Sequence, residues 1–345
     1  MYKRQTRYWE VFANDFGASY GATMTGTYVA ADVTGTEADI KGASHDGTNW
    51  SYTNAAGDAV ANTVAVDVTN PDVDITGRKP AGSDLVMNIK TILQGPSTGS
   101  VMSDALRSAG LLPTTEPYTG LGYTHSGSGG GEVINATVLN DLGTNDNIVD
   151  WVVVELRDMN DNTNVLETKS ALIQKDGDIV DLDGTSALSI PAPNADPSFY
   201  IAIRHRNHLG FMSNAPLALS STATAYDFTN NTIPMNGTNA LKNDGGVYKM
   251  WGGSANGDGY VRATQTFIPP ATTIPSDRDY ILNTSLGGNV NGQSDTYNSG
   301  DVNMDGHVRA TQTFIPPATT IPSDRDFILN SVLGGNVSGQ QKEQL

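Results

Sequence analysis

An internal duplication near the C-terminus constrains this 345-residue chain more than any other feature of its sequence. The stretch RATQTFIPPATTIPSDRDYILN at 262–283 recurs at 309–330 with one change, Tyr280 to Phe327. The similarity begins upstream, at GSANGDGYV in the first copy and GDVNMDGHV in the second, which gives a period of 47 residues. Two copies indicate a paired module rather than a solenoid, so residues 250–345 are predicted to form a duplicated tail domain.

The composition of the chain favours a mainly β fold. Gly 37 and Pro 16 stand beside only 17% charged residues, which suits short strands and turns better than long helices. Strand-like runs divided by turn signals fill 84–228, and further alternating runs fill 1–80. We expect tandem antiparallel β-sandwich modules in these two segments, the first truncated at its N-terminus, followed by the tail.

Four local signals add detail to this expectation. Asp176-Gly177 between two strand-like runs predicts a tight hairpin. Ser103 is expected to cap a short helix over DALRSAG, and the Gly/Ser run SGSGGG is expected to be a flexible loop. His205 and His208 lie three positions apart at the end of a predicted strand, which places them on opposite faces in structural roles.

Charge and residue usage exclude several classes of partner. Lys+Arg 20 against Asp+Glu 37 gives a net charge of −17, which disfavours nucleic acid and favours cations. With Cys 0, disulfides and thiolate metal sites are excluded. No apolar run is long enough to span a membrane, so membrane insertion is not expected. The chain also begins without an export signal, which we expect in missing upstream sequence.

Sequence signals of catalysis are absent. No serine stands in a G-x-S-x-G turn, no phosphate-binding glycine loop precedes a helix, and no pair of carboxylates can be placed across a cleft. We therefore predict a protein that is not an enzyme, with no catalytic residues and no residues for an organic cofactor.

The second copy of the duplication carries the clearest chemical signal. The oxygens of Asp301, Asn303 and Asp305 alternate along the chain, Gly306 permits a sharp turn, and the carbonyl of His307 is placed to coordinate. This pattern is the first half of an oxygen cage for Ca²⁺. Such a loop normally closes with an acidic residue at its twelfth position, but here a long insert intervenes before the next aspartates.

Either Asp324 or Asp326 can close the second loop after the insert. With Asp324 in that role, the apolar residues of the following helix, Ile328 and Val332 among them, fall on one face. Asp324 is therefore favoured, and Ser323 is expected to cap the helix.

The first copy repeats the pattern with one carboxylate fewer. Ser254 stands where the second copy has Asp301, so we expect one stronger calcium site in the second repeat and one weaker site in the first. Calcium is expected to act structurally, because so small a tail has little core of its own. The corresponding residues of the first copy are Asn256, Asp258, the Tyr260 carbonyl, and Asp277 or Asp279.

These motifs resemble a known group of bacterial proteins. Residues 253–335 resemble the dockerin-type, EF-hand-like calcium tail, in the interrupted form that ends large secreted surface proteins of gliding-type Gram-negative bacteria. Upstream, LQGPSTGSVMSDALRSAGLLPTTEPYTGLGY, NIVDWVVVELRD and FYIAIRHRNHLGFMS resemble the middle module of those proteins, and RYWEV resembles the preceding one. The resemblance implies an extracellular or cell-surface protein, haemagglutinin-like or adhesin-like, with no catalytic assignment.

Two functions follow as hypotheses. The first is a structural subunit that self-associates into a surface fibre or matrix as a homopolymer. The second is an adhesin or carbohydrate-binding module whose dockerin-like tail docks to a partner, with an exposed aromatic platform expected at Trp50 or Trp251. The Thr and Pro residues of the two inserts make glycans a further possibility.

Overall fold

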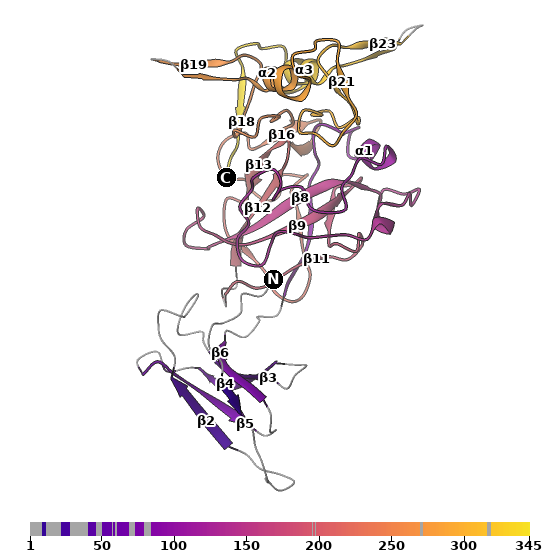
Figure 1. Cartoon of the computed structure of the whole chain (residues 1–345). Coiled ribbons are helices and arrows are strands. Elements are labelled where there is room, and N and C mark those ends of the chain that lie inside the picture. Colours follow the sequence, from indigo (N-terminus) through magenta and orange to yellow (C-terminus); the bar gives the residue numbers. More distant parts are fainter. Residues whose placement is uncertain are drawn as a thin grey trace. The chain divides into compact units, whose positions relative to one another are not determined.

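The computed structural model divides the chain into two compact units, residues 1–82 and 83–345 (Figure 1). It is mainly β with antiparallel sheets, which confirms the predicted class at that level. Within the described part, no helix has the length and apolar character of a membrane span. The structure describes residues 9–11, 22–27, 41–45, 50–56, 58, 61–68, 73–78, 84–194, 196, 198–269, 272–315 and 319–345.

The first unit contains two small sheets that pack face to face. A Cβ added to Gly42 would lie 2.0 Å from the carbonyl oxygen of Ala65, so the sheets approach each other closely at this glycine. Ala43, Val64 and Val66 are buried in this unit. The four-stranded sheet has the order β1 (Trp9–Val11), β6 (Val73–Arg78), β3 (Lys41–His45), β4 (Trp50–Ala56), and the other pairs β2 (Ala22–Thr27) with β5 (Thr63–Val68).

A nine-stranded sheet forms the centre of the second unit. Its strands pair in antiparallel fashion except for β15, which runs parallel to β7. The order is β11 (Leu188–Ile190), β7 (Leu85–Lys90), β10 (Asp178–Val180), β9 (Val165–Gln174), β8 (Ile148–Arg157), β12 (Ser198–His205) and β13 (His208–Met212), with β14 (Leu217–Ala218) beside β12 and β15 (Thr224–Asp227) beside β7.

The sequence of the central strands explains their position. All residues of β8 are buried, as its nearly continuous apolar run requires, and Trp151 at its centre is completely covered. The predicted hairpin at Asp176-Gly177 is confirmed, because β9 and β10 pair on either side of it and Gly177 has φ +96°.

Helices are short in the part of this unit that precedes the tail. They are α1 (Ala105–Ser108) and the 3₁₀ turn η3 (Ala136–Leu139). The predicted cap at Ser103 is wrong: the capping position is Asp104, which makes no side-chain cap bond. Its carboxylate instead accepts hydrogen bonds from Arg107 and Asn147.

The prediction that His205 and His208 lie on opposite faces of a strand is also wrong. β12 ends at His205 and β13 begins at His208, so the residues flank a turn instead of continuing one strand. Their rings therefore touch, with centroids 4.7 Å apart. His205 Nε2 lies 3.1 Å from a carboxylate oxygen of the buried Asp150.

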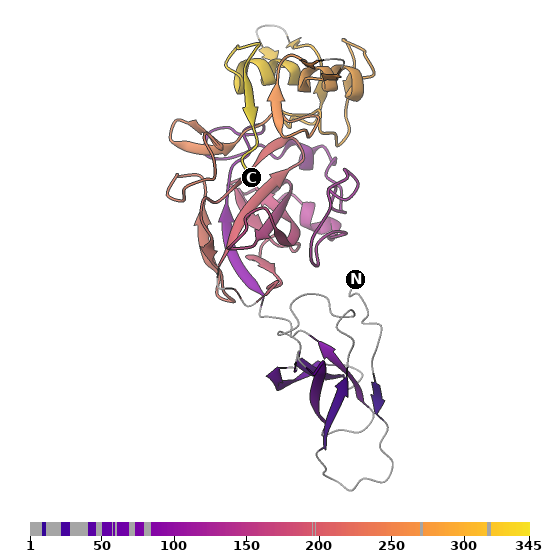
Figure 2. The ribbon, with the colours of Figure 1, turned by 90° about the vertical axis from the view of Figure 1, so that its left-hand side faces the viewer.

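The duplicated sequence folds into two copies of one arrangement. In each copy a short strand leads into a hairpin and then a helix. Figure 1 shows the hairpins extending to opposite sides of the helix pair, and Figure 2 shows the tail from the side of the first hairpin. The first copy contains β18 (Tyr260–Arg262), β19 (Thr266–Ile268), β20 (Thr272–Ile274), α2 (Asp277–Tyr280) and η4 (Ile281–Ser285). The second contains β22 (Val308–Arg309), β23 (Thr313–Ile315), β24 (Thr319–Ile321), α3 (Asp324–Asp326) and η5 (Phe327–Val332).

Short strands frame the two copies. They are β16 (Leu241–Asp244), which pairs with β17 (Val247–Met250), β21 (Gln293–Ser294), which pairs with β22, and β25 (Gln340–Lys342), which pairs with β18.

The tail packs directly on the nine-stranded sheet, and both belong to one compact unit. Met304 of the second copy is 1% exposed and joins the main hydrophobic core, although its φ of +57° is unusual for a residue other than glycine. Asn207, in the turn after β12, donates from Nδ2 to the Asp301 carbonyl oxygen at 2.6 Å. The second loop is thus anchored both by packing and by a buried hydrogen bond.

Candidate metal centre

Buried carboxylates mark the second loop of the tail. The side chains of Asp301, at the start of the loop, and Asp324, at the start of α3, belong to residues with no exposed surface. The insert separates them along the chain, yet the Val302 N–H donates to Asp324 Oδ1 at 2.9 Å. The fold therefore closes the loop across the insert with Asp324.

Backbone N–H groups surround these oxygens. Asp301 accepts from Asp305 at 3.1 Å and from Gly306 at 3.0 Å. The other oxygen of Asp324 accepts from the Arg309 N–H at 2.7 Å. In the described structure no cationic side chain pairs with either carboxylate, and each is held in place by neutral donors alone.

The pKa values of these carboxylates are shifted because like charges are buried next to one another. Burial raises the pKa of Asp301 to about 7, against the opposing charge of Arg206 and with a further rise from Asp305. Burial, followed by the charge of Asp301, raises the pKa of Asp324 well above its usual range. Two ionised carboxylates buried side by side are unfavourable without a cation between or beside them.

The second aspartate of each Asp-x-Asp sequence has a different task. Asp326 Oδ2 accepts from the Ser323 hydroxyl at 2.8 Å, and Ser323 Oγ accepts from the Asp326 N–H, which caps α3. Ser276 and Asp279 form the same reciprocal pair at α2. Asp326 and Asp279 are therefore occupied at helix N-termini, while their neighbours two residues earlier face the loops.

The first loop repeats this geometry with fewer charges. Asp277 is fully buried and accepts from the Arg262 N–H at 2.8 Å and from the Asn256 N–H at 3.3 Å. Burial raises the pKa of Asp277 to about 7, and the charge of Asp258 adds to this rise. Ser254 is buried at the position of Asp301 and supplies no carboxylate.

One arginine partly neutralises each loop. Arg309 Nη1 donates to Asp305 Oδ2 at 2.7 Å, and Arg262 Nη1 donates to Asp258 Oδ2 at 2.6 Å. The second loop thus holds three carboxylates against one guanidinium, whereas the first holds two against one.

The remaining predicted ligands lie along the same loops. Asn303 Oδ1 accepts from the Asp305 N–H at 3.0 Å, so its side chain turns into the loop. The His307 ring faces outward and contacts Asp295, as expected for a residue whose carbonyl was the predicted ligand. The ring of Tyr260 likewise lies outside, beneath the Arg262 guanidinium at 4.1 Å.

The donor set fits a hard cation. It consists of carboxylate, amide and backbone carbonyl oxygens, which suit Ca²⁺. The carboxylate oxygens of the second loop do not form a group of three that all lie within 4.8 Å of one another. Only one group of three acidic or histidine side chains in the described structure is that compact. A calcium site does not require such compactness, because oxygens on opposite sides of a Ca²⁺ ion lie roughly 5 Å apart.

That compact group is Glu116, His125 and Glu132, which the sequence analysis did not identify. The three residues share no motif, and only the folding of one long loop brings them together. A lone histidine between two distant glutamates gives no sequence signal that would distinguish them from surface residues.

No known protein family, curated protein or solved structure matches this chain.

Proposed function

We propose that this chain is a non-catalytic extracellular structural protein, a subunit of a surface fibre or matrix whose duplicated tail is stabilised by calcium. In this proposal the β regions are tandem sandwich modules and the tail is a dockerin-like pair of calcium loops. Membership of a surface assembly and the extracellular location rest on the resemblance of the sequence motifs.

One observation carries the calcium part of the proposal. Asp301 and Asp324 are fully buried next to each other, and the donors around them are neutral. Burying two like charges is costly, and a divalent cation bound there would offset that cost. The deeper burial and greater charge of the second loop support the order of affinity, with the stronger site in the second repeat.

Calcium titration of the metal-free chain by calorimetry tests this part. We expect two binding events in the wild type, and loss of the tighter event in Asp324→Asn, because an amide nitrogen would replace one oxygen ligand. Asp326→Asn is the matched control: its remaining oxygen still accepts from Ser323, so both events should persist. No calcium binding by the wild type, or wild-type binding by Asp324→Asn, would contradict the proposal.

The assembly part requires a separate measurement. Light scattering in millimolar Ca²⁺ and after EDTA should give large particles in calcium that shrink on chelation. A monomer in both buffers would exclude the fibre subunit and leave the adhesin hypothesis. That alternative has lost one of its predicted features, since Trp251 is only 8% exposed and its Nε1 donates to the Asn239 carbonyl. The side chain of Trp50 lies outside the described residues.

A further inference from the structure

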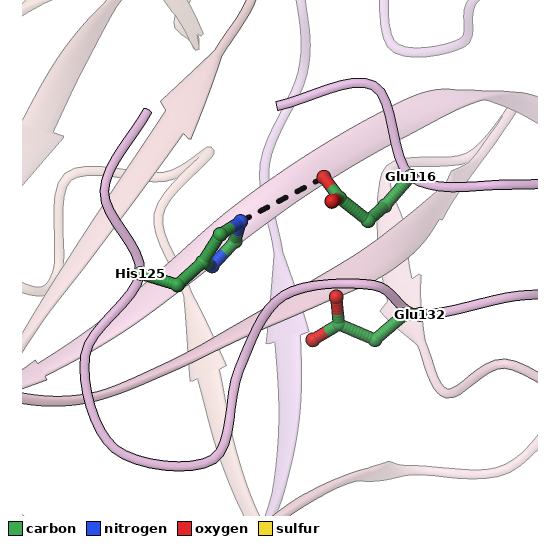
Figure 3. Close-up of side chains that lie close together, drawn as sticks. All are labelled: Glu116, His125 and Glu132. Carbon is green, nitrogen blue, oxygen red and sulfur yellow. Dashed lines mark ion pairs between the residues drawn. The ribbon is translucent and has the colours of Figure 1, made fainter. Parts of the chain in front are cut away.

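A long loop of the second unit brings two glutamates and a histidine to one point, apart from the tail. The loop is closed at its base, where the Glu116 N–H donates to the Glu132 carbonyl at 2.9 Å and the Ile134 N–H donates to the Thr114 carbonyl at 2.8 Å. Glu116 and Glu132 are therefore neighbours. His125 returns from the far part of the loop, and Figure 3 shows its ring beside both carboxylates.

The Gly/Ser run that was expected to be a flexible loop is in fact packed against β9. A Cβ on Gly127 would lie 2.0 Å from a Glu167 carboxylate oxygen, and one on Gly129 would lie 2.2 Å from the Thr168 carbonyl oxygen. Only glycine permits so close an approach. The run therefore fixes the path of the chain between His125 and Glu132.

Hydrogen bonds determine which nitrogen of His125 is free. Thr168 has a single hydroxyl proton, which it donates to the Ser126 carbonyl at 3.0 Å. It can then only accept from His125 Nδ1, which lies 3.2 Å away. With the Thr168 proton on the Ser126 carbonyl, the proton of a neutral His125 ring lies on Nδ1 and Nε2 carries a lone pair.

The Nε2 atom of His125 faces negative charge but has no hydrogen-bond partner. His125 Nε2 is buried and makes no hydrogen bond, and its nearest acidic contact, Glu116 Oε2, is 3.7 Å away. The His125 side chain is 7% exposed and that of Glu116 is 1% exposed. A lone pair aimed at carboxylates in a buried position calls for a cation between them.

Both carboxylates are already oriented by the backbone. Glu116 accepts from the N–H groups of Tyr118 at 2.7 Å and Gly131 at 3.2 Å, while Glu132 accepts from Ser170 at 3.1 Å. Burial alone would raise the pKa of Glu116, but its hydrogen bonds from Thr119, Gly131 and Tyr118 outweigh burial and lower it. These backbone donors hold both carboxylates in place beside the His125 ring.

We propose that Glu116, His125 and Glu132 bind a divalent transition-metal ion of the Zn²⁺ type, at a site separate from the calcium loops. Their ligand atoms all lie within 4.8 Å of one another. One imidazole nitrogen and two carboxylates are a zinc-type donor set that leaves a fourth position for water, whereas calcium prefers oxygen alone. The bound ion would fasten the loop over β8, where Tyr118 already donates to the Trp151 carbonyl at 2.7 Å.

The test is a Zn²⁺ titration of the full, untagged chain in excess Ca²⁺, so that its outcome does not depend on the tail loops. We expect one zinc site in the wild type and an affinity reduced roughly 100-fold or more in His125→Gln and Glu132→Gln, because each removes a direct ligand. Glu132→Gln keeps an oxygen for the Ser170 N–H and therefore tests the ligand with little change to the fold. Asp161→Asn, at an exposed aspartate outside both proposed sites, should bind zinc as the wild type does.

Two further results decide the proposal. Co²⁺ loaded into the chain should give visible d–d absorption that His125→Gln abolishes, while the far-ultraviolet circular dichroism of the variant stays that of the wild type. Absence of zinc binding by the wild type, or unchanged binding by His125→Gln, would overturn it. So would an NMR spectrum of the metal-treated chain in which His125 Nε2 carries a proton at neutral pH, because a proton would then hold the place of the metal.

Discussion

At the scale of single residues, the turn between β12 and β13 concentrates buried polar groups. The Gly95 N–H donates to His208 Nε2 at 2.9 Å, which leaves the proton of this ring on Nδ1, close to Asn207 Oδ1 at 2.8 Å. Burial lowers the pKa of His208 well below its usual value, and the charges of His205 and Arg206 act in the same direction. Burial also lowers the pKa of His205, although Asp150 opposes it.

These histidines predict an acid-labile structure. In the unfolded chain each would gain a proton near pH 6.5, about the normal histidine value, and in the folded chain neither does. The unfolded state then binds more protons at these two residues, so their contribution lowers the free energy of unfolding as the pH drops below about 6.5, by up to about 1.4 kcal/mol per pH unit for each histidine. The net slope of the metal-free chain also contains Asp277 and Asp301, whose raised pKa values act in the opposite direction. Urea denaturation between about pH 7.5 and about pH 5.5 measures this slope.

His208→Gln isolates the contribution of one ring. Its amide oxygen can accept from the Gly95 N–H without titrating, so we expect the slope to decrease by the share of one histidine. Wild type and variant are compared in the same buffers, which cancels the titration of every other group. An unchanged slope would show that His208 is not held neutral by the fold.

At the scale of elements, the cap of the last helix was predicted correctly from the sequence, unlike the cap at Ser103. Ser323 was expected as a cap, and its Oγ accepts from the Asp326 N–H at 3.1 Å. The helix after it buries Ile328 and Val332 on one face, as their spacing predicted. Both signals are local, within a few residues of the element that they define.

Removal of this cap should destabilise the tail measurably. Ser323→Ala leaves the Asp326 N–H without its acceptor in a fully buried position, so we expect the free energy of unfolding to fall by about 1–2 kcal/mol. Urea denaturation in calcium measures the loss. Ser338→Ala, at an exposed serine, should change stability by less than about 0.5 kcal/mol, and an equal effect of both would contradict the capping role.

Elements whose geometry depends on distant contacts were predicted less well. His205 and His208 were assigned to one strand because a two-residue turn between β12 and β13 has no strong sequence marker. The composition of the glycine run predicts a flexible loop. Its contact with β9 is not evident from the sequence because it involves residues some 40 positions away, Glu167 and Thr168. The Glu116, His125 and Glu132 group was missed for the same reason.

At the scale of the whole molecule, the tail and the nine-stranded sheet share buried contacts within the unit 83–345. Tyr297 in the tail donates to Asp150 of β8 at 2.6 Å, and its ring lies under the Arg206 guanidinium at 4.4 Å. Gln94 donates to the Ser331 carbonyl at 3.0 Å. We therefore expect changes in the second loop to affect the contacts with the sheet.

Chelation of calcium should open this region to proteases. We expect cleavage within 250–345 to accelerate at least tenfold in EDTA, the equivalent of about 1.4 kcal/mol of lost protection, and to slow again when excess Ca²⁺ is restored. Mass spectrometry of the fragments identifies where the cuts fall. Equal resistance with and without EDTA would mean that metal binding does not stabilise the tail.

The two hairpins of the tail have a consequence for how its sequence can change. Arg262 directly before the first hairpin bonds through its N–H to Asp277 directly after it, and Thr266 pairs with Ile274 inside the hairpin. The hairpin therefore begins and ends at the same place in the tail. Closure of the ligand loop places little constraint on the sequence of the hairpin itself. Yet 21 of 22 positions are identical between the copies there, against five of nine in GSANGDGYV and GDVNMDGHV. The likeness of the hairpins therefore has a source other than loop closure, either recent copying of this stretch of the gene or selection on the outward face that both copies present.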